Sequence, residues 1–222
     1  MTATVDTPPP VAPKAPLFGK AEKRAILDPM WSNNPIALQV LGICSALAVT
    51  TRLDKALVMG VGVTLVTALA NTVISFLRNW IPGKIRIVVQ LVVVSTLVIA
   101  FDQLLRAYMF DLSKQLSVFV GLIITNCIVM GRLEAFAMSN PPWRSFLDGI
   151  GNGLGYAWIL ACVGAIREVL GSGKLLGFHV VPKAVYDAGY VNNGLMVLAP
   201  GAFVLLGIIV WVQRAISGYS EK

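Results

Sequence analysis

The sequence predicts an all-α integral membrane protein with six transmembrane segments, arranged as two inverted repeats of three helices each. The first observation is composition: the 222 residues are 56% hydrophobic and only 13% charged, whereas about 25% of residues are charged in an ordinary soluble domain. The second is that long uncharged stretches alternate with short charged connections. The third is that the order of one short and two long apolar segments occurs twice along the chain.

The distribution of charged residues along the chain indicates how the chain lies in a membrane. The formal net charge is +7, but the basic residues are spread over the ends of apolar segments and form no patch. This pattern indicates lipid headgroup contact rather than nucleic-acid binding. More Lys and Arg fall on the cytoplasmic side if the N-terminus is inside, so the distribution favours cytoplasmic N- and C-termini.

Residues 1–30 are predicted to be a flexible tail. Prolines and basic residues dominate it, and it shows little apolar periodicity. It also lacks the continuous apolar core of a secretory signal peptide, so we expect it to belong to the mature chain on the cytoplasmic side.

Four uncharged or nearly uncharged stretches are long enough to cross a bilayer, which requires about 20 apolar residues. They are residues 56–77, 86–107, 146–170 and 195–213.

Two further apolar segments, residues 36–49 and 116–130, are shorter. A helix of this length covers only about 22 Å of the roughly 30 Å hydrocarbon core. Ser32-Asn33-Asn34-Pro35 precedes the first and Asp111-Leu112-Ser113 the second, which predicts that a helix begins at the start of each segment. Each should then end or unwind inside the membrane, covered by other parts of the protein.

The two halves of the chain, residues 31–110 and 111–222, match as repeats. The first short segment contains Cys44 and is followed by Arg52-Leu53-Asp54, while the second contains Cys127 and is followed by Arg132-Leu133-Glu134. Each half continues with two long segments. Three crossings per repeat place the copies in opposite orientations, an arrangement whose functional sites lie near the midplane at broken helices.

Cys44 and Cys127 are the candidate metal ligands, because the repeat gives them matching positions. Thiolates are the usual ligands of iron and iron-sulfur centres, but four are needed and the repeat supplies two. A partner subunit would have to supply the rest. The alternative is that both cysteines are small residues that let helices pack closely, which is also how we interpret the unmatched Cys162.

Other conspicuous residues have structural interpretations. The glycines at 149, 151, 153 and 155 open a membrane span, which favours close helix packing over nucleotide binding. Asp102 is expected to pair with Arg106 at the i+4 position. We expect Arg167 and Glu168 at the membrane interface and His179 in a surface loop.

The chain resembles the D-type membrane subunits of bacterial sodium-translocating NADH:quinone oxidoreductases. The resemblance covers nearly the whole chain after the tail. It is carried by residues 33–39 (NNPIALQ), 41–49 (LGICSALAV), 125–132 (TNCIVMGR) and 148–155 (DGIGNGLG). The related E-type subunits of Rnf ferredoxin:NAD oxidoreductases usually have proline after the first cysteine, where this chain has Ser45.

The resemblance implies that Cys44 and Cys127 are metal ligands. In that family the D-type subunit pairs with a homologous E-type membrane subunit in a six-subunit complex of the inner membrane. Each of the two contributes two cysteines to an iron or [2Fe-2S] centre that relays electrons across the membrane. The complex oxidises NADH, reduces ubiquinone and exports Na⁺. No Ser/Thr-Gly-Ala-Thr attachment sequence occurs here, so we expect no covalent FMN on this chain.

Three other functions compete with this one. The first is an Rnf-type ferredoxin:NAD oxidoreductase subunit. The second is a secondary transporter, because inverted repeats with broken helices are typical of alternating access. The third is a scaffold that only anchors catalytic subunits.

Overall fold

The computed structural model describes residues 26–30, 33–108, 121–175, 178–179 and 194–216, so the predicted tail lies almost entirely outside the described residues. The regular structure within these ranges is helical apart from one hairpin of two-residue strands, β1 (Lys174–Leu175) and β2 (Phe178–His179). His179, expected in a loop, therefore lies in a strand. An all-α membrane architecture is otherwise confirmed.

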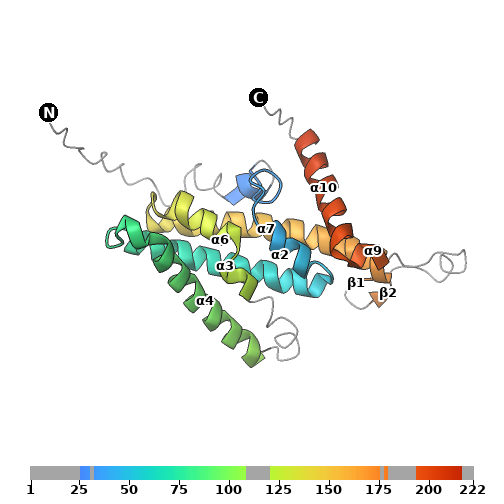
Figure 1. Ribbon diagram of the computed structural model, residues 1–222, viewed down its shortest axis with the longest axis horizontal. Helices are drawn as coiled ribbons and strands as arrows, with labels where there is room; N and C mark the ends of the chain where they lie inside the picture. The colour runs from blue at the N-terminus through green and yellow to red at the C-terminus, as the bar shows by residue number, and fades with distance from the viewer. Residues whose placement is uncertain (1–25, 31–32, 109–120, 176–177, 180–193, 217–222) are drawn as a thin grey trace, which may run out of the picture.

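Two long helices, α3 (Leu53–Leu77) and α7 (Pro142–Ser172), form the centre of the molecule (Figure 1). They run antiparallel, because positions that advance along α3 meet positions that recede along α7. A Cβ added at Gly149 would lie 2.6 Å from the Ala68 Cα atom, and one added at Gly153 would lie 2.5 Å from the Thr64 Cα atom. Close packing is thus confirmed for these two members of the glycine run.

The predicted short helices are broken, and this corrects their boundaries. Residues 35–39 form turns, the backbone is left-handed at Val40 (φ 57°) and Gly42 (φ 77°), and the helix α2 begins only at Ile43 and ends at Val49. Asn34 caps these turns rather than a helix, since its side-chain oxygen accepts hydrogen bonds from the backbone N–H groups of Ile36 and Ala37.

The second short segment is interrupted at Thr125 and Asn126. Residues 121–124 are helical, and α6 then extends over Cys127–Arg132. It continues directly into the π-helix η3 (Leu133–Ala137). Residues 109–120 lie outside the described residues, so the predicted start at residue 116 is not tested.

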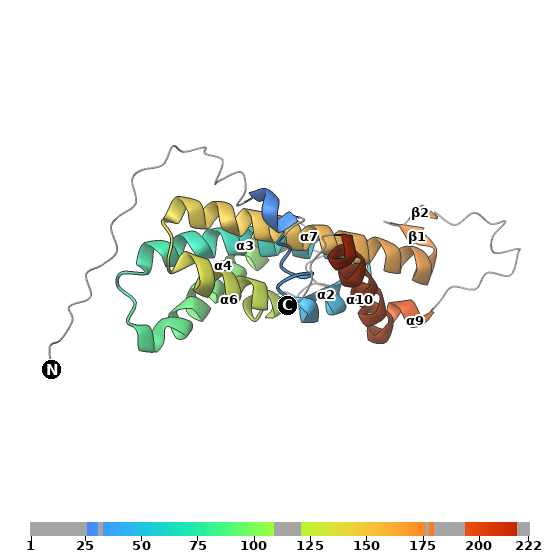
Figure 2. The same ribbon diagram turned by 90° about the horizontal axis from the view of Figure 1, so that it is seen from above.

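α2 and α6 lie along one side of the α3–α7 pair (Figure 2). α4 (Arg86–Tyr108), preceded by the short 3-10 turn η2 (Gly83–Ile85), leads away from one end of the pair. The short α9 (Gly194–Val197) and α10 (Ala199–Ile216) follow from the other end (Figure 1).

Four described helices are long and apolar enough to cross a membrane, and they match the four predicted spans. They are Leu53–Leu77, Gly83–Tyr108, Pro142–Ser172 and Ala199–Ile216. The count of six segments, their inverted symmetry and the division at residue 110 stay predictions.

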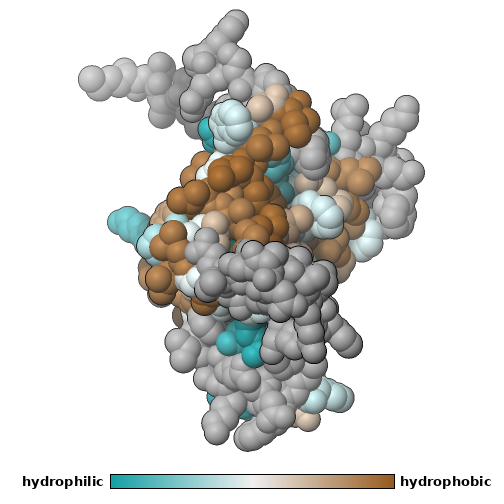
Figure 3. All heavy atoms as spheres, turned by 90° about the vertical axis from the view of Figure 1, so that its right-hand side faces the viewer, coloured by the Kyte–Doolittle hydropathy of each residue, from teal (hydrophilic) through white to brown (hydrophobic). Residues whose placement is uncertain are grey.

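The outer surface of the long helices is apolar. Large exposed hydrophobic side chains occur on α3, α4 and α10, among them Leu65, Val92 and Val204. Seen from the end where α9 and α10 lie, hydrophobic residues form a broad area with few hydrophilic ones between them (Figure 3). Such a surface suits contact with lipid chains.

Candidate metal-ligand site

Both predicted ligand residues lie directly after a break in a short helix. Cys44 is the second residue of α2 and Cys127 is the first residue of α6. Both are free and exposed on this chain. Their neighbours differ sharply, because Ser45 and Asn126 are each only 3% exposed. Each break therefore places a buried polar residue beside an exposed thiol.

The two breaks contact each other. A Cβ added at Gly42 would lie 2.7 Å from the Ile128 Cδ1 atom, and one added at Gly131 would lie 3.2 Å from the Leu41 Cδ1 atom. A glycine of each segment thus faces an aliphatic side chain of the other. These contacts bring the segments that carry the two cysteines together, although they are more than 80 residues apart in sequence.

One buried hydroxyl joins the two breaks to α7. The Ser45 hydroxyl donates to the Gly42 carbonyl at 2.9 Å and lies 2.7 Å from the hydroxyl of Tyr156. It also accepts a hydrogen bond of 3.2 Å from the side-chain amide of Asn126. Since a serine hydroxyl donates once and accepts twice, the Tyr156 hydroxyl is the donor to Ser45 and the capacity of Ser45 is filled.

We call Ser45, Asn126 and Tyr156 the hydroxyl node. Tyr156 is completely buried, and its ring packs under the first break, 3.1 Å from the position that a Gly42 Cβ would occupy. Asn126 also caps α6, because its side-chain oxygen accepts from the backbone N–H of Ile128 at 3.1 Å. The node was not among the sequence-based predictions, since an isolated tyrosine in an apolar span gives no signal of a polar contact.

The donor set fits half of a tetrathiolate centre. Two exposed thiols stand on adjoining segments fixed by buried hydrogen bonds, and thiolates are the ligands that iron and iron-sulfur centres take. Across the described ranges no group of three or more His, Cys, Asp or Glu side chains could hold a metal ion. Further ligands would therefore have to come from outside the described residues, and the exposure of both thiols leaves them open to another chain.

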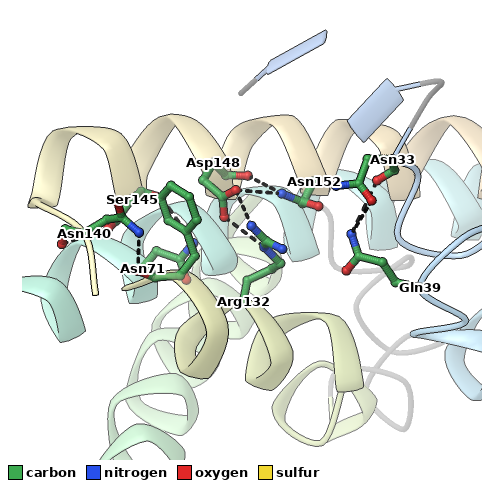
Figure 4. A network of polar contacts seen from close by, with 9 residues as sticks. Asn33, Gln39, Asn71, Arg132, Asn140, Ser145, Asp148 and Asn152 are labelled. Atoms are coloured by element: carbon green, nitrogen blue, oxygen red, sulfur yellow. Dashed lines mark hydrogen bonds and ion pairs between the residues drawn. The ribbon is translucent and has the colours of Figure 1, made fainter. Parts of the chain in front are cut away.

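A polar network braces α6 against α7 (Figure 4). Arg132 on α6 makes two hydrogen bonds to the Asp148 carboxylate on α7, of 2.9 Å and 2.5 Å. The side-chain amide of Asn152 donates to the same carboxylate at 3.1 Å.

Glu134, the acid of the second Arg-Leu-acid tripeptide, pairs with Arg86 at the start of α4. The matching acid of the first half, Asp54, pairs with Arg52 at 2.7 Å, so the two tripeptides pair differently.

A second brace holds the other end of α2. The Arg167 guanidinium on α7 donates to the Thr50 hydroxyl at 2.6 Å and to the Leu47 carbonyl at 3.2 Å, both at the C-terminal end of α2. It also donates to the carbonyls of Met196 and Val197, at 2.9 and 2.8 Å, where α9 ends. A cation at free helix carbonyls matches both the hydrogen-bond need and the dipole of a helix C-terminus.

Glu168, the next residue, bonds to the N-terminal end of α3. Its carboxylate accepts a 2.8 Å hydrogen bond from the backbone N–H of Leu53, the first residue of α3. Arg167 is 1% exposed and Glu168 is 7% exposed. Both side chains are thus enclosed by protein and bond to helix ends, and their expected position at the membrane interface stays a prediction.

The remaining predictions are resolved simply. Asp102 pairs with Arg106 at 2.8 Å, as predicted. Cys162 is half-buried within α7 and is a free cysteine.

These features define a class: a multi-pass membrane protein with two broken short helices, each presenting a cysteine and braced on one long helix. The model of the family described as "Rnf-Nqr subunit, membrane protein" matches residues 23–210, and the chain belongs to this family. Among similar proteins is the D-type subunit of the Na(+)-translocating NADH-quinone reductase of Proteus mirabilis (strain HI4320). It is 59% identical over 197 residues, which cover 89% of this chain and 94% of that protein.

The subunits of the same name from Yersinia pestis (strain Pestoides F) and Yersinia pseudotuberculosis serotype O:1b (strain IP 31758) are each 58% identical over the same shares. The resemblance drawn from the sequence motifs is thereby confirmed.

Proposed function

We propose that this chain is the D-type membrane subunit of a sodium-translocating NADH:quinone oxidoreductase in a bacterial inner membrane, with both termini cytoplasmic. The similarity to proteins of that name over most of the chain supports the assignment. In this proposal Cys44 and Cys127 supply two thiolates to an iron or [2Fe-2S] centre, and a homologous E-type subunit supplies two more.

The observation that carries the proposal is the pairing of two exposed thiols with one shared buried support. Both cysteines stand at helix breaks that contact each other and are joined through Ser45. Packing cysteines would be expected inside the protein. Here the buried positions are held by their neighbours, and the thiols remain free to meet a partner.

When bound, such a centre accepts one electron and passes one on. The residues of this chain would hold it at the junction of two broken helices, where apolar surroundings make a change of its charge costly. We propose that this cost links electron transfer, as part of NADH oxidation and ubiquinone reduction by the whole complex, to Na⁺ export.

The test compares Cys127→Ala with Cys162→Ala in membrane vesicles that contain the complete complex. We predict that Cys127→Ala abolishes NADH-driven quinone reduction and Na⁺ uptake, because one ligand is lost. The control Cys162→Ala should retain both activities. Full activity of assembled Cys127→Ala complex would exclude the electron-relay role. A secondary transporter would instead bind a solute as an isolated chain.

A further inference from the structure

We propose that the hydroxyl of Tyr156 is a positioning group that fixes the separation of Cys44 and Cys127 through Ser45 and Asn126. The proposal rests on the proposed metal site and extends it to residues that bear no ligand. The juxtaposition behind it is direct: a tyrosine on α7 bonds to a serine next to one cysteine, and that serine bonds to an asparagine next to the other.

The node makes a polar connection between the two breaks. Ser45 immediately follows Cys44, and Asn126 immediately precedes Cys127. Adjacent Cα atoms are about 3.8 Å apart, so each cysteine backbone lies one residue from the Ser45–Asn126 hydrogen bond. A change in this bond shifts one thiol relative to the other.

Burial makes the node stiff. Tyr156 is fully buried, and Ser45 and Asn126 are nearly so, so water cannot readily replace a lost partner. Hydrogen bonds in such surroundings are strong, and a buried polar group without a partner is costly. The tyrosine ring also packs beside the Gly42 turn, 3.1 Å from the position of an added Cβ. This contact leaves the first break little freedom to move relative to α6.

Fixed thiol separation matters to a thiolate centre because ligand geometry and the groups that orient the ligands affect both metal affinity and electronic properties. Substitution of such orienting groups typically changes affinity or activity on the order of 10-fold or more. Tyr156→Phe removes one oxygen atom and keeps the ring, and Ser45→Ala removes the central acceptor. Neither change touches a sulfur atom.

The experiment uses the complete complex carrying Tyr156→Phe, Ser45→Ala or both changes, with Tyr108→Phe as the matched control. Tyr108 ends α4 and is 82% exposed. Iron content, the spectrum of the reduced centre and the rate of iron release to a ferrous chelator are measured on each purified complex.

We expect Tyr156→Phe and Ser45→Ala to release iron on the order of 10-fold faster than the unmodified complex and to change the spectrum. Tyr108→Phe should change neither property. The effect of the double variant should be smaller than the sum of the two single effects, because each single change already removes the contact between the Tyr156 and Ser45 hydroxyls.

Release rates and spectra equal to those of the unmodified complex in Ser45→Ala and Tyr156→Phe would overturn the proposal. Additive effects of the two changes would also overturn it, because they would mean independent contributions to stability. If Tyr156→Phe fails to assemble, Ser45→Ala decides by the same criteria. Failure of the proposed function appears separately, as iron that persists when Cys44 is replaced by alanine.

Discussion

Gly42 shows how single residues shape the site. Its φ of 77° lies in the left-handed region, which favours glycine, and its missing side chain leaves room for Ile128 and Tyr156. Glycine is therefore favoured at this position for two reasons, its left-handed backbone conformation and the lack of space for a side chain. The lack of space arises from contacts with residues more than 80 positions away.

Gly42→Ala is expected to destabilise the protein by about 1 to 3 kcal/mol. Alanine is strained in the left-handed conformation of this residue, and its methyl group must displace the side-chain atoms of Ile128 and Tyr156. Thermal denaturation of the purified complex, with iron content followed in parallel, measures the effect. Gly121→Ala is the matched control, since no atom of the described residues lies within 4 Å of its added Cβ. Equal stability of the two variants would contradict the close contact between the breaks.

Between elements, the packing of α3 on α7 depends on small residues at matching positions. A Cβ at Gly60 would lie 2.7 Å from the Cβ of Ala157, and one at Gly153 would meet the backbone of Thr64. Small side chains let helix backbones approach closely, which is a main source of association energy in membranes. α7 of this helix pair also carries both braces, through Asp148 and Arg167.

Gly153→Ala should therefore lower stability by about 1 to 3 kcal/mol, since the backbone of Thr64 cannot move aside without separating the helices. Within the part of the chain that the structure describes, nothing lies within 4 Å of a Cβ added at Gly207 on α10, so Gly207→Ala should be neutral or slightly stabilising. Denaturation of the two purified variants under the same detergent conditions provides the comparison. A neutral Gly153→Ala would show that the helices are further apart than described.

Arg167 connects three elements, because it lies on α7 and bonds to the ends of α2 and α9. Arg167→Met should lower stability by about 2 kcal/mol, since the buried Thr50 hydroxyl and several part-buried carbonyls lose their donor, and the loss of a partner costs about 1 to 3 kcal/mol for a buried group. Arg167→Lys should be intermediate, because an ammonium group cannot reach both helix ends.

Heat stability of the purified complex tests this, with Arg106→Met as the control. Arg106 is 54% exposed and pairs with Asp102 near the end of α4, and an ion pair with a solvent-exposed partner contributes only about 0 to 1 kcal/mol. Equal effects of the two methionine variants would mean that the Arg167 contacts contribute no more to stability than the Arg106–Asp102 ion pair.

For the whole molecule, the four long spans could be predicted because each is a long apolar stretch with few charged residues. The short length of the other two segments predicts that each ends or unwinds within the membrane, but it does not predict the positions of the breaks at Val40–Gly42 and at Thr125–Asn126. The first break packs against Ile128 and Tyr156, which are distant in sequence.

The candidate site was likewise predictable only in part. Cys44 and Cys127 stand out in sequence because they recur in matching segments. The partners of Arg167 lie about 30 and about 120 positions away, and the support from Tyr156 comes from a different half of the chain than Ser45. Local patterns carry no information about such pairings.

Iron analysis of the purified complex after single cysteine replacements decides whether the two breaks hold the ligands of a membrane centre. Cys44→Ala and Cys127→Ala should each lose the iron of that centre and its spectrum. Cys162→Ala should retain both, because Cys162 lies within α7 and at neither break. Unchanged iron and an unchanged spectrum in Cys44→Ala or Cys127→Ala would contradict the assignment of these residues as ligands.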